Sequence, residues 1–221
     1  MKKIGLVLVA GGSGKRMNSS LPKQFIEINN KPILQYTIDL FLQWNKEIEI
    51  VLALPHSQID YWKSISTKED LSKYKICKGG KERFHSVKNA LALFDDMDYI
   101  MVHDGVRPLV NEKTLDRCIQ ALGKHSSAIP VLQPSESIRI IKGESSETLN
   151  RDSIRLVQTP QCFNGQRLKE SYEVEYDEQF TDDASVFSKA GHHIHLVEGN
   201  PENIKITRPM DLEVMKIYLS K

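Results

Sequence analysis

The chain has 221 residues, of which 40% are hydrophobic and 27% charged, and a formal net charge of +1 at pH 7. This length suits one medium domain whose core needs no disulfides or metals, so we expect a single domain over residues 1–221. The near-neutral charge does not favour long-range attraction to nucleic acid or to a membrane, and no stretch approaches the ~18 apolar residues of a membrane span. We therefore expect neither as a partner.

Strand-like apolar runs alternate along the chain with segments of helical spacing. The alternation indicates βαβ units and so predicts a layered, Rossmann-like α/β domain around a mainly parallel sheet, whose carboxyl-end loops hold the ligand. The expected strands are Ile4 to Ala10, Ile48 to Leu54, Lys75 to Lys78, Tyr99 to His103, Ala128 to Leu132 and Ile194 to Glu198. The expected helices are Pro32 to Phe41, Phe84 to Phe94, Leu115 to Leu122 after an Asn111 cap, Gly165 to Glu175, Asp182 to Ala190 and Pro209 to Leu219.

One segment, residues 134–155, breaks this rhythm. Ser137 to Ile141 alternates in hydrophobicity, a Lys-Gly-Glu-Ser-Ser turn follows, and Glu147 to Arg151 returns. A two-stranded arm is only marginally stable alone in water, so it needs a partner surface, most simply another subunit. We therefore expect a protruding β-hairpin arm that serves dimerisation.

The cysteines and histidines give no metal signature. Cys77, Cys118 and Cys162 are odd in number, widely spaced and without the close partners of a zinc site. His193 and His195 share one face of an expected strand, but no carboxylate or cysteine at ligand spacing accompanies them. The pattern favours reduced thiols in the cytoplasm.

The first expected strand runs into a glycine-rich, cationic segment, Ala10 to Met17, and Lys23 follows shortly after. Glycines let the backbone approach an anion closely while Lys and Arg supply positive charge, so the segment predicts a phosphate site. It is not a Walker loop, because Val9 stands at the first glycine position and Arg16 at the Ser or Thr position; Met17 likewise breaks the dinucleotide fingerprint. A plain strand-to-loop exit is the alternative.

A second glycine pair, Gly79-Gly80, stands directly before an expected helix. Glycines there free the backbone to meet a flat base edge, and Ser86 can donate or accept a hydrogen bond in the first helical turn. Alone, the pattern is more typical of a turn followed by a serine near a helix N-terminus.

Charged residues follow the later strands. Asp104 should emerge at the carboxyl end of the sheet, where a carboxylate can hold Mg²⁺, and Arg107 can reach a phosphate bidentately. Lys205 lies between two isoleucines before a proline-started helix, which is less typical of idle surface charge. The alternatives are an Asp-Gly turn with a local ion pair at Asp104 and a helix cap at Thr181 to Ser185.

Taken together, these residues closely resemble the cytidylyltransferase family of the non-mevalonate isoprenoid pathway, which joins CTP to 2-C-methyl-D-erythritol 4-phosphate. Six motifs occur in the family's order over nearly the whole chain, which is specific where one motif would be weak. The motifs are Ala10 to Met17 with Pro22-Lys23-Gln24, Gly79-Gly80 with Arg83 and Ser86-Val87, His103-Asp104 with Arg107-Pro108, Thr159-Pro160-Gln161, Thr181-Asp182, and Asn203-Ile204-Lys205.

The resemblance implies in-line attack of the substrate phosphate on the CTP α-phosphate, giving 4-diphosphocytidyl-2-C-methyl-D-erythritol and pyrophosphate. It implies Mg²⁺ or another divalent cation on Asp104, and a homodimer in which Arg151 reaches into the neighbouring subunit's site. The implied nucleotide-binding residues are Ala10, Gly11, Gly12, Ser13, Gly14, Gly80, Ser86 and Asp104. The implied catalytic residues are Arg16, Lys23, Arg151 and Lys205, and the implied substrate-binding residues are Arg107, Ser137, Arg151, Thr159, Thr181 and Lys205.

Three other functions compete with this reading. A ribitol 5-phosphate cytidylyltransferase shares several of the motifs, although Thr181 to Ser185 favours methylerythritol phosphate. A hexose nucleotidyltransferase commonly carries more residues after the nucleotide domain. A catalytically silent nucleotide-binding protein would need only some of Arg16, Lys23, Asp104 and Lys205, all of which are present.

Overall fold

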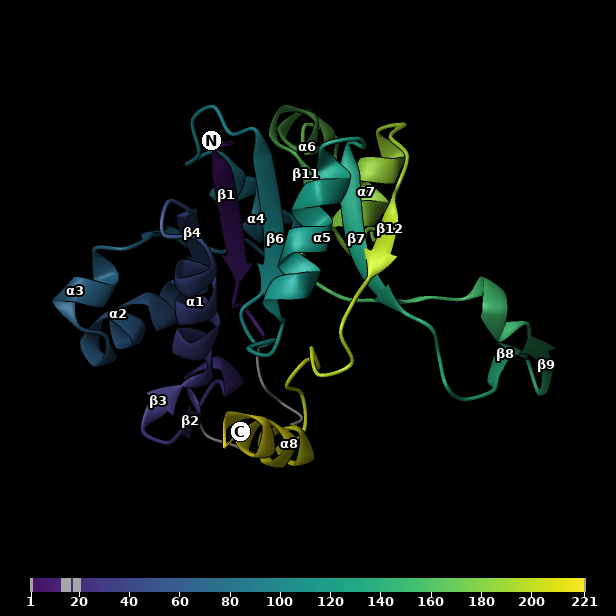
Figure 1. The fold of residues 1–221 in the computed structure, drawn as a ribbon, viewed down its shortest axis with the longest axis horizontal. Helices are drawn as coiled ribbons and strands as arrows, with labels where there is room; N and C mark the ends of the chain where they lie inside the picture. Colours follow the sequence, from purple (N-terminus) through teal and green to yellow (C-terminus); the bar gives the residue numbers. More distant parts are fainter. Residues whose placement is uncertain (1, 13–16, 18–20, 221) are drawn as a thin grey trace.

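The computed structural model describes residues 2–12, 17 and 21–220, which build an α/β domain (Figure 1). Its main sheet has eight strands in the order β10-β7-β11-β6-β1-β4-β5, with β12 also paired to β7. The strands are β1 (Ile4–Val9), β4 (Glu49–Leu54), β5 (Lys75–Lys78), β6 (Tyr99–Asp104), β7 (Ser127–Leu132), β10 (Leu156–Val157), β11 (Gln161–Asn164) and β12 (Leu196–Glu198).

The sheet is mainly parallel, as the alternation of elements predicted. β1 pairs in parallel with β4 and β6, and β4 with β5, so the carboxyl ends of these four strands lie along one edge. β11 enters antiparallel between β6 and β7. Neither β11 nor the two-residue β10 was expected, because these segments are too short to show an alternating pattern.

Helices cover both faces of the sheet (Figure 1). α1 (Ile33–Trp44) and α5 (Glu112–Leu122) pack on one face, and α4 (Arg83–Leu91), α6 (Gly165–Ser171) and α7 (Asp183–Lys189) on the other. Alternate residues of β1 divide between these layers, Leu6 and Leu8 with the first and Val7 with the second. Both faces of β1 are therefore buried, as is typical of a central parallel strand.

All six expected helices are present; α8 (Pro209–Leu219) has the expected bounds and the other five have shifted ends. The Asn111 cap of α5 is confirmed, since its Oδ1 accepts from the Thr114 backbone N–H at 2.9 Å. α6 ends at Ser171 rather than at Glu175. α2 (His56–Ile65) and α3 (Lys68–Leu71) were not expected; Trp62 is the only buried residue of α2 and none of α3 is buried, so neither shows a wide apolar stripe.

The C-terminal helix α8 (Pro209–Leu219) packs beside the small hairpin of β2 (Glu27–Ile28) and β3 (Lys31–Pro32). A separate apolar cluster holds these elements together; its buried residues are Met17, Ile28, Ile33, Val106, Ile206 and Met215. The short 3₁₀ helix η2 (Lys23–Phe25) lies next to the segment before α8, where Lys23 Nζ donates to the Ile206 carbonyl. Lys23 and Lys205 thereby approach the same edge of the sheet.

β8 (Ile138–Lys142) and β9 (Ser145–Leu149) form a separate two-stranded antiparallel sheet that extends away from the body of the domain (Figure 1). Ile140 and Ile141 on β8 are 42% and 72% exposed. A short 3₁₀ helix, η3 (Arg151–Ser153), follows β9. Among the described residues, none of the helices has the length and apolar character needed to cross a membrane.

Candidate active site

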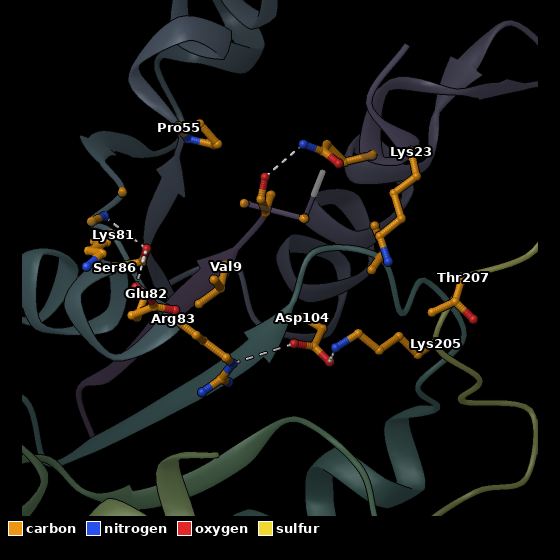
Figure 2. Close-up of a pocket in the computed structure, with 17 residues that line it drawn as sticks. Val9, Lys23, Pro55, Lys81, Glu82, Arg83, Ser86, Asp104, Lys205 and Thr207 are labelled. Atoms are coloured by element: carbon orange, nitrogen blue, oxygen red, sulfur yellow. Dashed lines mark hydrogen bonds and ion pairs between the residues drawn. The ribbon is translucent and has the colours of Figure 1, made fainter. Parts of the chain in front are cut away.

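A cavity of about 660 Å³ lies at the carboxyl ends of β1, β4, β5 and β6 (Figure 2). This is the edge at which a parallel α/β sheet places its ligands. The lining residues that the sequence also predicted are Ala10, Gly11, Gly12, Lys23, Gly80, Ser86, Asp104 and Lys205. Segments from five parts of the chain therefore converge on one hollow.

Asp104, the last residue of β6, stands in the cavity among three cations, two of which come from other segments of the chain. Its Oδ2 is 3.1 Å from Lys205 Nζ and 3.1 Å from Arg107 Nε, and its Oδ1 is 3.9 Å from Arg83 Nε. Figure 2 shows the carboxylate between Arg83 on one side and Lys205 on the other. Burial alone would raise the pKa of Asp104, but the three cations hold it well below its usual range. The carboxylate is therefore ionised.

A buried histidine positions the backbone on both sides of Asp104. His103 Nε2 lies 3.0 Å from the Arg107 carbonyl, which can only accept, so Nε2 carries the proton. Nδ1 then accepts from the Thr159 hydroxyl at 3.0 Å, and Thr159 Oγ1 accepts from the Asp104 N–H at 3.1 Å. Burial lowers the pKa of His103 to about 4, which keeps the imidazole neutral. Through its hydrogen bond to the Asp104 N–H, Thr159 holds the backbone of Asp104 in place.

The glycine loop after β1 is braced by the η2 segment. Gln24 Nε2 donates to the Ala10 carbonyl at 2.9 Å, and Lys23 Nζ donates to the Ile206 carbonyl at 2.9 Å. A Cβ at Gly12 would approach Lys23 Cε to 3.2 Å, so this glycine allows the lysine to lie close to the loop. Ser13, Gly14 and Arg16 lie outside the described residues.

The loop between β5 and α4 forms another wall of the cavity. Gly80 N–H donates to Ser86 Oγ at 3.0 Å, and the same hydroxyl donates to the Glu82 carbonyl at 3.2 Å. A Cβ at Gly80 would lie 2.2 Å from His85 Cβ, so glycine is required here by close packing. The Ser86 hydroxyl thus stabilises the turn from Gly80 to Glu82 at this wall of the cavity.

The ion pair of Arg83 with Asp183 was missed by the sequence reasoning. Arg83 Nη1 and Nη2 donate to Asp183 Oδ1 and Oδ2 at 2.8 and 2.7 Å, and Tyr172 Oη donates to Oδ1 at 2.6 Å. Burial would lower the pKa of Arg83, but the adjacent Asp183 raises it. One sequence signal could have indicated this pair. Thr181-Asp182-Asp183 has two acids, but the helix cap needs only Asp182, which leaves Asp183 to be explained.

The remaining predicted substrate residues do not line the cavity. Arg107 lies behind Asp104 and also donates to the Asn203 carbonyl at 2.8 Å. Thr181 is exposed just before the α7 cap. Ser137 and Arg151 are exposed beside the β8–β9 hairpin, and Arg151 Nη1 donates to the Ser135 carbonyl at 2.7 Å.

The fold and the cavity together define an α/β protein of the phosphate-handling class, with a glycine loop and a cation-ringed carboxylate at the ligand edge of its sheet. Residues 4–221 match the family described as 2-C-methyl-D-erythritol 4-phosphate cytidylyltransferase. The chain belongs to this family.

Individual relatives agree with that assignment. The enzyme of this name from Bacteroides thetaiotaomicron is 44% identical over 213 residues, covering 96% of this chain and 97% of the relative. The solved structure of 4-diphosphocytidyl-2C-methyl-D-erythritol synthase from Anaerococcus prevotii is 29% identical with a TM-score of 0.82, covering 100% of this chain and 99% of that one. The bifunctional IspDF of Campylobacter jejuni is 31% identical with a TM-score of 0.82; the match covers 96% of this chain and 54% of that longer chain.

Proposed function

We propose that this protein transfers the cytidylyl group of CTP to 2-C-methyl-D-erythritol 4-phosphate and releases pyrophosphate. The observation that carries the proposal is the cavity at the carboxyl edge of the sheet, which the glycine loop, Lys23 and Lys205 line together with the ionised Asp104. The family match supports the choice of both substrates. A cavity of about 660 Å³ is of ordinary size for a small-molecule site.

A divalent cation, which we propose is Mg²⁺, fits Asp104 only together with the nucleotide. Within the described ranges, no group of three or more His, Cys, Asp or Glu side chains is arranged to hold a metal. Mg²⁺ commonly uses one or two carboxylates and takes its other ligands from phosphates and water. Asp104 would supply one protein ligand, and the bound cation would neutralise charge on the triphosphate.

Lys23 and Lys205 are placed to stabilise the charge that builds up at the α-phosphate during in-line attack. Both line the cavity, and the contact of Lys23 Nζ with the Ile206 carbonyl links the two segments that carry them. Preorganised cations in a partly water-excluded site stabilise developing charge without reorganising at the moment of reaction. Arg16 keeps its proposed role beside them as a prediction.

The acceptor phosphate is proposed to lie beyond Asp104, toward Arg107 and Thr181. Arg107 is held against Asp104, and Thr181 is exposed before α7. Because Thr159 Oγ1 is already hydrogen-bonded to Asp104 N–H and His103, we propose that its main effect on the acceptor is indirect. Ser137 stays a proposed contact on the arm.

We further propose a homodimer in which the β8–β9 hairpin delivers Arg151 to the partner's cavity. Among the residues that the structure describes, β8 and β9 pair with each other and with no other strand, and Ile141 is exposed. Burial of this apolar side chain against a second copy would stabilise the arm. The three free thiols are consistent with a reducing compartment such as the cytoplasm.

Pyrophosphate release with CTP and Mg²⁺ tests the function, with methylerythritol 4-phosphate compared against ribitol 5-phosphate. We expect release with the first acceptor and little with the second, and with CTP rather than ATP, GTP or UTP. Preference for ribitol phosphate would keep the chemistry and change the substrate. Absence of release with both would favour a silent nucleotide-binding protein.

A further inference from the structure

We propose that Asp183 and Arg83 are positioning residues that hold the Thr181 segment in register with the nucleotide wall of the cavity. The proposal rests on the function proposed above, because it assigns the acceptor to the Thr181 segment. Asp183 begins α7 and Arg83 begins α4, so their ion pair joins the first turns of two helices on the same face of the sheet.

Asp183 is a completely enclosed carboxylate. It is 0% exposed, does not line the cavity, and accepts hydrogen bonds from Arg83 Nη1, Arg83 Nη2 and Tyr172 Oη. Any effect of Asp183 on turnover must therefore pass through Arg83, through Tyr172 or through α7.

Arg83 connects this buried anion to the reacting site. Both terminal nitrogens bind Asp183, and the remaining Nε lies 3.9 Å from Asp104 Oδ1 inside the cavity. The planar fork fixes the guanidinium in one orientation, which a lysine ammonium in the same place could not do. Arg83 is thus held in place by Asp183 and is not available as a bidentate phosphate ligand.

The two helices are anchored to different degrees. α4 is held in the core by four fully or nearly buried apolar side chains, Phe84, Val87, Ala90 and Leu91. α7 has seven residues, of which two apolar ones, Val186 and Phe187, are buried, and its cap residue Asp182 follows the exposed Thr181. Loss of the ion pair should therefore displace the first turn of α7 and the Thr181 segment rather than α4.

A second connection supports the same turn. Gln161 on β11 donates through Nε2 to Asp182 Oδ2 at 2.8 Å, and its Oε1 accepts from the Ala184 N–H at 2.8 Å. The first turn of α7 is thus tied to the sheet through Gln161 and to α4 through Arg83. Only the tie to α4 reaches the nucleotide wall of the cavity.

Steady-state kinetics of Asp183→Asn, Arg83→Lys and the double variant test the proposal. We expect each single variant to raise KM for the acceptor about tenfold while KM for CTP stays within about twofold and kcat falls little. The double variant should be no worse than the poorer single variant, because the pair acts as one unit. Asp39→Asn removes the Lys31–Asp39 ion pair away from the cavity and is the matched control.

Equal rises in both KM values, or a loss confined to kcat, would overturn the proposal. The first result would indicate general loosening of the fold, and the second an action on Asp104 alone. Multiplying effects in the double variant would also contradict it, because the two side chains would then act independently.

Hydrogen exchange provides a readout that needs no substrate. In Asp183→Asn we expect the amides of residues 183–186 to exchange about tenfold faster, with those of residues 84–91 unchanged. Unchanged or equal exchange in both segments would refute the coupling. If the wild-type protein released no pyrophosphate, the proposed function would fail, while hydrogen exchange would still decide whether the ion pair joins the two helices.

Discussion

Asp104 and Arg151 are both predicted site residues, but they lie in regions that hold a charged side chain in opposite ways. Asp104 is 7% exposed and lies among three cations, Arg107 close in sequence and Arg83 and Lys205 from distant segments, with its backbone fixed by Thr159 and His103. Arg151 is exposed, and its side chain donates a hydrogen bond to the nearby Ser135 carbonyl. The described residues that surround Asp104 all come from one chain, whereas the arm is proposed to bring Arg151 to a second subunit.

The largest effect should come from removing one of the cations that line the cavity. Lys23→Ala removes a buried cation beside the glycine loop and should cost about 3 kcal/mol of transition-state stabilisation, or roughly 100-fold in kcat. Pyrophosphate release under saturating substrates measures it, with thermal unfolding as the control for folding. Unchanged kcat would remove Lys23 from the catalytic set.

The buried His103 should make the cavity region sensitive to acid. Its folded pKa of about 4 lies below the ordinary value of 6.5, so the unfolded chain binds the proton first as pH falls. The contribution of His103 to stability should therefore fall by up to about 3 kcal/mol between pH 6.5 and 4 and change no further below that window.

Denaturant unfolding at several pH values measures this loss in the wild type and in His103→Gln. The variant should show a smaller decrease over the same window, even where its stability at neutral pH is lower. Parallel decreases in the two proteins would mean that His103 is not the group responsible.

Arg151→Ala tests the arm. We expect a loss of about 2 kcal/mol in kcat/KM, the scale of a charged hydrogen bond, with no change in unfolding, because Arg151 is exposed. Mixing this variant with Lys23→Ala should restore about a quarter of the wild-type activity if mixed dimers form at random and each contains one intact composite site.

The matched control mixes Lys23→Ala with Lys205→Ala. These two lysines line the same cavity of one chain, so no mixed dimer would have an intact site. Rescue in both mixtures, or in neither, would contradict a site shared across subunits.

The smallest effect should come from removing the Thr159 hydroxyl, which hydrogen-bonds to the backbone of Asp104. Thr159→Val removes a hydroxyl that serves Asp104 N–H and His103 Nδ1, and should destabilise the fold by about 1.5 kcal/mol. Thr159→Ser keeps the hydroxyl and should retain most of that stability. Equal losses in the two variants would mean that the hydroxyl is not the group that stabilises this position.

Much of the framework follows from local sequence patterns. The β1 run, the Asn111 cap and the emergence of Asp104 at a strand end each depend on residues that are close in sequence, and the structure contains all three. The strand β11 did not follow from such a pattern. Its four residues, Gln161–Asn164, are buried because they enter between β6 and β7, and that pairing is decided by distant partners.

The candidate site divides in the same way. The motifs placed Lys23, Gly80, Asp104 and Lys205 in one cavity, with the family resemblance supplying roles that spacing alone left open. The ion pair between Arg83 and Asp183 was not foreseen, because the two residues lie 100 positions apart. A helix cap is a sufficient local reason for acidic residues at the start of α7, so the sequence did not indicate that the carboxylate of Asp183 is buried and paired.

By itself, the sequence determined the α/β class, the cationic glycine loop and the residue types that meet at the carboxyl edge of the sheet, because periodicity, turn chemistry and charge are local properties of a chain. Only the tertiary structure decided which cations surround Asp104, which nitrogen of His103 carries its proton, and that Asp183 orients Arg83. Those choices depend on burial and on contacts between distant segments, where loss of water makes each polar group require a specific partner.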